Sequence, residues 1–224
     1  GKPVDKLDGS LSGTVDLGGT YGNPSLNVVG SIKDVTIDTK VVGDAKIDAS
    51  LENRKFKIRT LKLPVDDGLI AAGGTVDLDG DADLQIAVRD VDIEPVLPLI
   101  GDNINATGSI TGVINMTGVT KNPKVELSAS LANGSYNGID IDQGFVLATM
   151  ENHVINVQRI QGVKEDYKLS AYGKIPLAAL YTTGYLDAND SKAMDMTIDF
   201  NEADMAVIPL ITPTVKDATG ALKG

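Results

Sequence analysis

Several residue types are rare or missing in this chain of 224 residues. It has no cysteine, no tryptophan and a single histidine. Without cysteine the chain forms no disulfide and has no thiolate chemistry. One histidine without cysteine partners is a poor basis for a catalytic triad or a zinc centre. The sequence also has no apolar run near the roughly 18 residues that a membrane-spanning helix needs.

Positive charge is also scarce. The chain has 20 Lys and Arg against 31 Asp and Glu, a formal net charge of −11. This balance argues against a nucleic acid partner and against docking on an anionic membrane surface, since both require basic patches. Any membrane contact would have to be apolar or made through a partner protein.

The apolar residues that are present indicate a β protein. Hydrophobic residues make up 42% of the chain but aromatic residues only 4%, and glycine occurs 24 times. The apolar side chains are therefore mostly Val, Ile, Leu and Ala, and turn signals such as Gly-Asn-Pro and Glu-Asn are frequent. We expect an all-β fold that is ordered, with few helices.

Fifty residues of the chain recur 99 positions later without a gap. The stretch beginning at Gly9 aligns with the stretch beginning at Gly108, and ten positions are identical, including Asn53 and Asn152. The ending from Gly220 resembles the opening of a third copy. We therefore expect the chain to be a segment of a longer array of repeats.

The repeat divides the chain into four parts. Residues 1–8 would hold the end of a preceding repeat, with Gly1 left over from expression, and residues 9–103 would form β-repeat one. Residues 104–215 would form β-repeat two, and residues 216–224 would begin a truncated third repeat. No Gly/Ser/Pro-rich linker separates the two main repeats, so we expect them to share one continuous sheet.

Alternation of apolar and polar residues predicts about six strands in each repeat. Leu11, Val15 and Leu17 alternate with Ser12, Thr14 and Asp16, and the same period of two continues through the first repeat and into the second. The short spacing between strands is typical of an antiparallel meander. Each strand should have one apolar and one polar face.

One stretch in each repeat breaks this period. Residues 93–100 and the matching residues 205–211 are apolar, contain proline and follow an acidic residue, Asp92 or Asp204, that is able to cap a helix. We predict one short helix at the end of each repeat, limited in length by its internal proline.

A sheet with one apolar face needs a cover for it. One short helix per repeat covers much less surface than six strands present. Either the sheet folds onto itself, as in a sandwich or a β-helix, or it curls into an open trough whose lining is left for another molecule. The periodicity alone leaves both alternatives open.

The repeated motif resembles that of a known family. Gly9-Ser-Leu-Ser-Gly13 and Gly108-Ser-Ile-Thr-Gly112 are each followed by an Asn-Pro turn, a strand, and later an acidic strand that leads into a Leu-Pro-Leu-Ile-type segment. This order resembles the repeats of the TamB family, the translocation and assembly module component in the AsmA-like, bridge-like lipid transfer group. The resemblance extends over nearly the whole chain.

The resemblance implies a fold, a location and partners. It implies an elongated antiparallel sheet curled into a U-shaped hydrophobic groove, the β-taco, in a protein that is anchored in the inner membrane and extends through the periplasm. The implied ligands are phospholipid acyl chains, and an outer-membrane barrel partner would bind through regions outside this sequence. The exposed sheet edges near 11–17 and 196–200 would also favour self-association.

On this reading the apolar strand positions line the groove. We predict lipid contacts for these positions: Leu11, Val15, Leu26, Val28, Ile47, Leu51, Phe56, Ile58, Val76, Ile86, Ile110, Ile114, Val125, Leu127, Val146, Met150, Ile155, Val157, Ile175 and Ile198.

Two features resemble reactive sites only superficially. His153 lies in a predicted turn and has no sequence partners for catalysis, so we expect a solvated turn residue. Asp79, Asp81 and Asp83 alternate like the start of a calcium loop, but Leu84 replaces the glycine that such a loop needs. We expect no enzymatic activity, no metal and no cofactor.

Two functions therefore remain in competition. The chain would carry acyl chains along the apolar lining between inner and outer membrane, or it would serve as a scaffold whose free edge strands pair with outer-membrane β-barrel proteins during assembly. A rigid spacer is a third, simpler alternative. The sequence does not separate these functions.

Overall fold

The computed structural model describes residues 7–37, 40–97, 105–165, 167–180, 193–201, 203–204 and 221–222. The strands of the main sheet are β1 (Leu7–Thr20), β2 (Asn23–Ile37), β3 (Lys40–Glu52), β4 (Lys55–Val65), β5 (Gly68–Asp77), β6 (Asp81–Asp92), β7 (Ala106–Val119), β8 (Lys124–Tyr136), β9 (Ile139–Glu151), β10 (Val154–Lys164), β11 (Tyr167–Pro176) and β12 (Asp195–Asn201). Two short strands, β13 (Ala203–Asp204) and β14 (Ala221–Leu222), pair separately.

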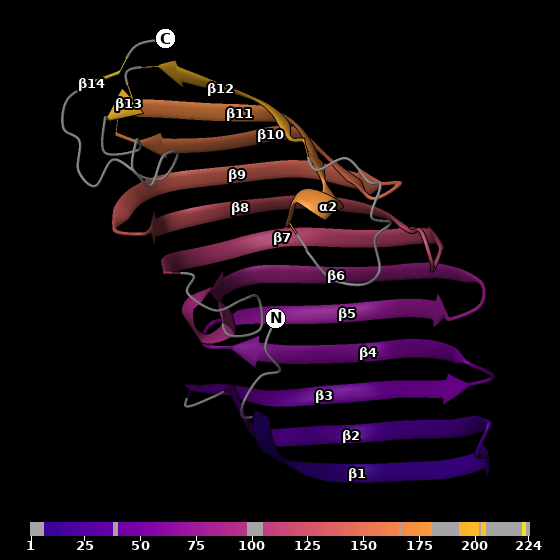
Figure 1. The fold of residues 1–224 in the computed structure, drawn as a ribbon. Helices are drawn as coiled ribbons and strands as arrows, with labels where there is room; N and C mark the ends of the chain where they lie inside the picture. Colours follow the sequence, from indigo (N-terminus) through magenta and orange to yellow (C-terminus); the bar gives the residue numbers. More distant parts are fainter. Residues whose placement is uncertain are drawn as a thin grey trace.

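The twelve main strands form one antiparallel sheet in sequence order, β1 to β12 (Figure 1). Each strand pairs with its neighbours in the chain, and most connections are tight hairpins; β6 to β7 and β11 to β12 are joined by longer segments. Within this sheet β1 and β12 each have a neighbour on one side only. The predicted all-β architecture, an elongated antiparallel sheet built from tandem repeats, is confirmed.

The two repeats are equivalent in backbone detail as well as in sequence. The register of β4 and β5 shifts between Ile58 and Leu61, and that of β10 and β11 shifts between Val157 and Ile160, 99 positions later. Asp34 and Asn133, also 99 apart, have φ of 52° and 49°. Strands β1–β6 and β7–β12 are therefore two copies of one six-stranded unit.

Tight turns fix the ends of several hairpins. Asn53 and Arg54, between β3 and β4, have φ of 48° and 61°, and Asn152 and His153 repeat this conformation with 51° and 59°. Two consecutive residues with positive φ are the signature of the type I′ turn, whose twist matches that of the flanking strands. His153 is thus a turn residue, as its sequence context predicts.

Neighbouring turns are also linked to one another along this edge of the sheet. The N–H of Leu78 donates to the Arg54 carbonyl at 3.1 Å, and the N–H of Leu177 donates to the His153 carbonyl at 2.8 Å in the second repeat. Between the repeats, the N–H of Thr120 donates to the Gly80 carbonyl at 2.9 Å. We call this edge the turn rim.

The second repeat is longer than the first by an insertion between its last two strands. Gly74 pairs with Leu84, and Gly173 pairs with Met196. The glycines are 99 positions apart but their partners are 112 apart, so 13 residues have been added. The short helix α2 (Leu177–Leu180) lies in this insertion.

The predicted helix at the end of each repeat is not seen among the described residues. In the described part of the stretch from residue 93, a 3₁₀ turn forms, η1 (Glu94–Val96), and Asp92 Oδ1 accepts a bond from the Glu94 N–H at 3.1 Å. Leu97, directly after η1, also has helical backbone angles, and residues 98–100 lie outside the described residues. The matching stretch 205–211 lies outside the described residues, and α2 occupies a different place.

A cluster of buried hydrophobic side chains lies near η1. It comprises Val35, Ile37, Val42, Ala45, Val65 and Val91. Val65 is 0% exposed and Val91 is 1% exposed. The η1 turn contacts both β3 and β7, so it spans the intervening strands and covers this end of the first repeat. This cluster lies at the rim opposite the turn rim, while a few other buried side chains, such as Ala148 and Val157, lie in the second repeat.

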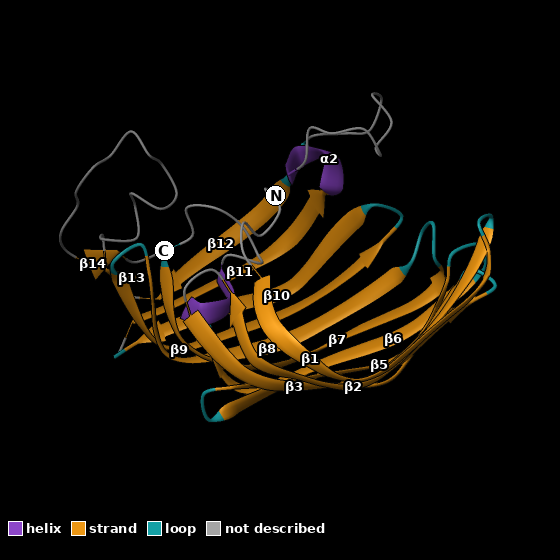
Figure 2. Ribbon diagram, turned by 90° about the horizontal axis from the view of Figure 1, so that it is seen from below, coloured by secondary structure: helices purple, strands orange, loops and turns teal. Residues whose placement is uncertain are grey.

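Over the rest of the sheet, the described residues form a single layer. Figure 2 shows the strands bowed along their length, which gives the sheet a concave and a convex side, with the η1 turn on the concave side. Of the predicted curl of the sheet into a U-shaped groove, the structure shows only this bowing of the strands. Within the described part of the chain, no helix has the length and apolarity needed to cross a membrane.

Candidate functional site: an uncovered apolar face

The twenty predicted lining residues all lie on one face of the sheet. Residues paired across antiparallel strands point to the same side, so the face is traced by following the register. Val15 pairs with Val28, Leu26 with Leu51, and Leu51 with Phe56. The same chain of pairs continues through the second repeat to Ile175 and Ile198. We call this the apolar face.

One row of this face crosses all twelve strands at its centre. The row consists of Gly13, Gly30, Ile47, Leu61, Ala72, Ile86, Ile114, Leu127, Ala148, Val157, Gly173 and Met196. No polar side chain interrupts it. With about 4.8 Å between strands, the row is roughly 50 Å long.

Most of the apolar face is not covered by described residues. Leu11 is 53% exposed, Phe56 is 42% exposed and Ile198 is 38% exposed, although all three point to the apolar side. Most other predicted lining residues are half-buried by their own neighbours, and Val157 is buried. Apolar side chains of this size are usually inside a protein. A continuous exposed apolar surface commonly marks an interaction site.

The apolar face is the concave side of the sheet. The buried cluster includes Ala45, and Ile32 and Leu63 pack against it; these residues belong to the apolar face, and η1 contacts β3, the strand of Ala45. Since η1 lies on the concave side in Figure 2, the apolar face is concave.

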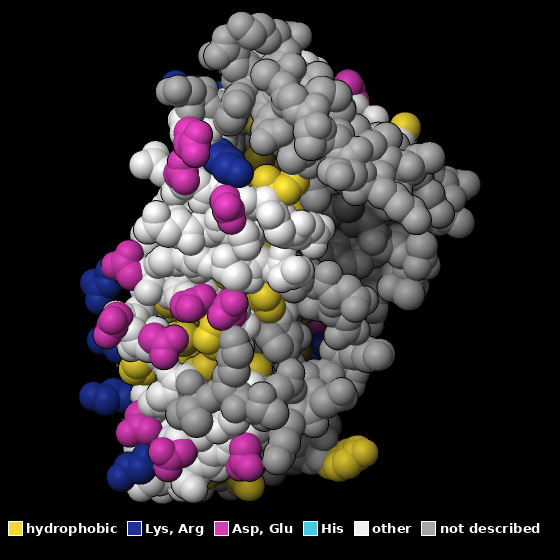
Figure 3. Space-filling view, turned by 90° about the vertical axis from the view of Figure 1, so that its left-hand side faces the viewer, with side chains coloured by type: hydrophobic (Ala, Val, Ile, Leu, Met, Phe, Trp, Pro, Cys, Tyr) yellow, Lys and Arg dark blue, Asp and Glu magenta, His cyan; other side chains and the backbone are white. Residues whose placement is uncertain are grey.

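The convex face has the charged and polar residues. Arg59 donates to Asp48 at 2.6 Å, to Asn27 at 2.7 Å and to Ser50 at 3.1 Å, all on outward positions of the first repeat. In Figure 3, Lys and Arg side chains project from the left of the view, the side turned away from the viewer in Figure 1. The two faces thus differ in polarity along the length of the sheet.

Alternation of apolar and polar residues did not predict the small residues of the apolar face. Gly13 and Gly30 are opposite each other, and a Cβ on Gly13 would lie 2.2 Å from the Val29 carbonyl oxygen. Gly112 faces Ala129, and Gly144 faces Gly162. At these positions the backbone itself forms the surface of the apolar face, so the face is lower there than where larger side chains stand. Glycines at strand positions that alternate with polar residues were the available signal.

The convex face differs between the repeats, which the sequence analysis also missed. Lys46 and Asp48 of the first repeat correspond to Phe145 and Leu147 of the second, which are 37% and 39% exposed. Tyr172, two strands away, is 49% exposed. The charged network of Arg59 therefore has no counterpart on this part of repeat two.

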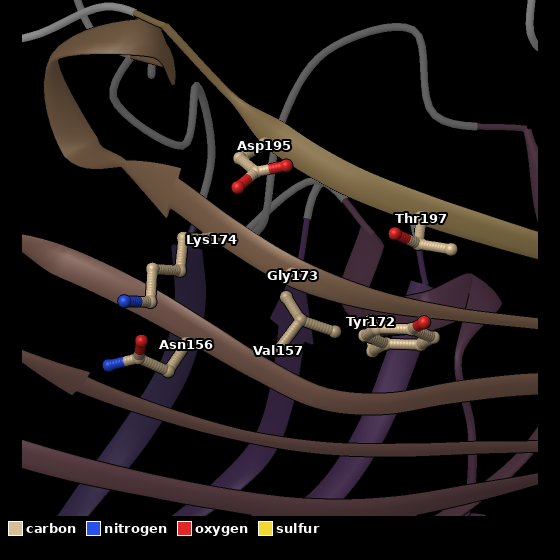
Figure 4. Close-up of a pocket in the computed structure, with 7 residues that line it drawn as sticks. All are labelled: Asn156, Val157, Tyr172, Gly173, Lys174, Asp195 and Thr197. Carbon is tan, nitrogen blue, oxygen red and sulfur yellow. The ribbon is translucent and has the colours of Figure 1, made fainter.

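A shallow pocket lies over the last three strands (Figure 4). It is lined by Asn156, Val157, Tyr172, Gly173, Lys174, Asp195 and Thr197. Most of these residues hold outward register positions, and the Lys174 ammonium points away from Asp195. The pocket brings together one carboxylate and one amine, without a histidine, a cysteine or a second acid. It does not form a nucleophile and base pair of the kind used in catalysis.

Two exposed ion pairs stabilise the charged forms of their members. The hydrogen bond from Arg54 to Asp79, at 2.5 Å, lowers the pKa of Asp79 and raises the pKa of Arg54. The pair links the turn after β3 to the turn after β5 and so belongs to the turn rim. Similarly, Glu126 raises the pKa of Lys124 through a bond of 2.6 Å on the convex face.

The aspartates spaced like the start of a calcium loop, from Asp79 onward, lie at the turn between β5 and β6. Asp79 pairs with Arg54, the N–H of Asp79 bonds to Asp77 Oδ1 at 3.0 Å, and Asp81 begins β6. Among the described residues, no group of three or more His, Cys, Asp or Glu side chains is arranged to hold a metal ion. The apolar face remains the strongest candidate site.

The chain matches no protein-family model, no curated protein and no solved structure in the comparisons with known proteins.

Proposed function

We propose that the apolar face holds the acyl chains of phospholipids, with their headgroups toward the solvent. In this proposal the chain is one periplasmic section of a bridge that carries phospholipid between inner and outer membrane. The repeats of Gly9 to Gly13 and Gly108 to Gly112, which resemble those of the TamB family, support this assignment. The same resemblance supports an inner-membrane anchor and an outer-membrane barrel partner outside this sequence.

The observation that carries the proposal is the uninterrupted central row. From Gly13 on β1 to Met196 on β12, no polar side chain and no charge lies on the path. A methylene removed from water contributes about 0.8 kcal/mol. A chain of about 16 carbons therefore has enough apolar surface for micromolar binding after ordering costs, without a specific polar contact. Headgroup selectivity should accordingly be low.

A second function is favoured by a different feature, the outer edge of β1, which has no partner strand among the described residues. This strand has 14 residues, and its described side chains from Asp8 to Thr20 are all exposed. An edge of this length offers backbone donors and acceptors to another strand. The alternative is that the edge serves as a template for outer-membrane β-barrel proteins during their assembly.

A matched pair of charge variants tests the lipid proposal on the purified chain. Ile114→Asp introduces a carboxylate into the central row, whereas Val113→Asp introduces it one residue away on the opposite face. A charge beside hydrocarbon is costly. We expect Ile114→Asp to weaken binding of a fluorescent phosphatidylethanolamine at least tenfold and Val113→Asp to change it less than threefold.

Mass spectrometry of lipids that co-purify with each protein provides a second readout. Phospholipid should be found with the unmodified chain and with Val113→Asp but be depleted with Ile114→Asp. If the unmodified chain binds neither the fluorescent lipid nor any co-purifying lipid, the lipid proposal is wrong. Equal losses in both variants would indicate a general effect of charge instead of a site on the apolar face.

A further inference from the structure

The lining of the apolar face changes chemically from the first repeat to the second. Three leucines of repeat one, Leu17, Leu51 and Leu84, are replaced by methionines in repeat two. Met116 and Met150 correspond to Leu17 and Leu51 at the 99-residue offset. Met196 corresponds to Leu84, since the two residues face the equivalent glycines Gly173 and Gly74. The chain has five methionines in all, so most of them lie on this half of the face.

The register brings two of these methionines close together. Met116 and Met150 both pair with Val125, one from each side, so they lie two strands apart in one row. The backbones at this separation are about 10 Å apart. Methionine side chains are long and flexible, and both point to the same side of the sheet. Their thioethers therefore flank a single valine on the apolar face.

Met196 lies in the central row and covers a glycine. A Cβ placed on Gly173 would lie 2.9 Å from Met196 Sδ, so the sulfur rests directly over the glycine backbone. Gly173 in turn pairs with Val157, which is buried. The Met196 thioether thus forms part of the floor of the apolar face near β10 to β12.

All three methionines are half-buried, so they are in contact with apolar neighbours but remain accessible. Thioethers that reach solvent are the usual targets of methionine oxidation, and the chain has no thiol to compete for the oxidant. A sulfoxide is polar and has a strong acceptor oxygen, in contrast to the apolar thioether. Oxidation would place up to three such groups on the path of an acyl chain.

We propose that Met116, Met150 and Met196 form a reversible oxidation site that controls the apolar character of repeat two. The reacting sulfur attacks one oxygen of hydrogen peroxide, a sulfur–oxygen bond forms and the peroxide bond breaks. The other oxygen leaves as water, so the sulfur is oxidised by two electrons and the peroxide is reduced. Methionine sulfoxide reductases reverse the change. The effect on lipid binding rests on the proposed function, while the site itself does not.

The first repeat provides the control variant. Met116→Leu, Met150→Leu and Met196→Leu together install the residues that repeat one has at the same positions, so the sheet should fold unchanged. Met194, which is 59% exposed, and Met205 remain in this triple variant. They report oxidation at methionines other than these three, because both proteins contain them.

The experiment treats both proteins with hydrogen peroxide, removes the peroxide with catalase, and locates sulfoxides by peptide mass spectrometry. Fluorescence of anilinonaphthalene sulfonate then measures accessible apolar surface, and fluorescent phosphatidylethanolamine measures lipid binding. Circular dichroism checks that the β signal is retained. We expect sulfoxides at all three positions, with at least a tenfold loss of lipid affinity and a clear loss of dye binding. In the triple leucine variant both should change less than twofold.

The outcomes separate the two proposals. If neither protein binds lipid before oxidation, the lipid function fails, and dye binding alone decides the oxidation site. Sulfoxides at the three positions without a loss of dye binding would overturn the oxidation site. An equal loss in the triple leucine variant would also overturn it, since the change would then come from Met194 or Met205.

Discussion

The side-chain amide of Asn23 donates a 2.9 Å hydrogen bond to Asn53 Oδ1, across the turns that end β1 and β3. In the second repeat, Asn122 donates to Asn152 Oδ1, also at 2.9 Å. This bond ties each Asn-Pro turn to the neighbouring type I′ turn. Together with the backbone bonds along the turn rim, it holds successive hairpins at a fixed spacing. These local links help the sheet to keep its shape.

The turn at Asn53 should be sensitive to the choice of residue. Asn53→Ala removes the bond to Asn23 and places an alanine at φ of 48°, where a Cβ is disfavoured by about 1–2 kcal/mol. Asn53→Gly removes the same bond but tolerates this φ. Urea denaturation should therefore show a larger loss of unfolding free energy for alanine than for glycine, and the same order at Asn152. Equal losses for the two substitutions would show that backbone strain is not involved.

Truncation of valines should separate the small core from the apolar face. Val65 is 0% exposed, and Val65→Ala should lower the unfolding free energy by about 2–3 kcal/mol through lost burial and a cavity. Val125→Ala, on the half-buried apolar face, should cost less than about 1 kcal/mol because the side chain is already partly in solvent. The measurement is again urea denaturation. Similar losses at the two positions would mean that the apolar face is an ordinary folding core.

Two glycines provide a matched test of the sheet geometry. Gly74 has φ of 136°, and a Cβ there would lie 2.1 Å from the Asp83 carbonyl oxygen. A Cβ on Gly162 would meet nothing within 4 Å. We expect Gly74→Ala to destabilise the chain by at least about 1 kcal/mol and Gly162→Ala to be neutral or slightly stabilising. Thermal unfolding followed by circular dichroism distinguishes them; a stable Gly74→Ala protein would contradict the described strand spacing.

The Arg54–Asp79 pair should make a small, pH-dependent contribution to stability. Because Arg54 lowers the pKa of Asp79, the folded state favours the carboxylate. The contribution is fully present above the ordinary Asp value of about 3.9 and is lost as the pH falls through the lower folded pKa. The difference in unfolding free energy between the unmodified chain and Asp79→Asn should therefore shrink from pH 6 toward pH 2. A constant difference over this range would show that the pair does not stabilise the fold.

Much of the sheet could be predicted because alternation of polarity reflects strand faces directly. Leu11, Ile58 and Val157 fall on one face since each strand has a period of two and each repeat has the same register. The gapless alignment covers fifty residues, and the alternation beyond it predicts about six strands in each repeat. The equivalent bonds made by the N–H groups of Leu78 and Leu177 lie beyond those fifty residues.

Other features depend on contacts that alternation does not encode. Of the stretch expected to be helical from residue 93, the described residues show the 3₁₀ turn η1. The Asn23–Asn53 bond depends on which turns become neighbours. Whether the apolar face is covered or open could not be decided either, since a sandwich and an open sheet require the same alternation.

Site-specific photo-crosslinking in cells that produce the full-length protein is the most direct test of the central claim. A benzophenone amino acid is placed at Ile58, on the apolar face, or at the adjacent Lys57, on the convex face. If the apolar face holds acyl chains, Ile58 will capture phospholipid and Lys57 will not. Capture of outer-membrane protein instead of phospholipid at Ile58, or equal capture of phospholipid at both positions, would contradict the account.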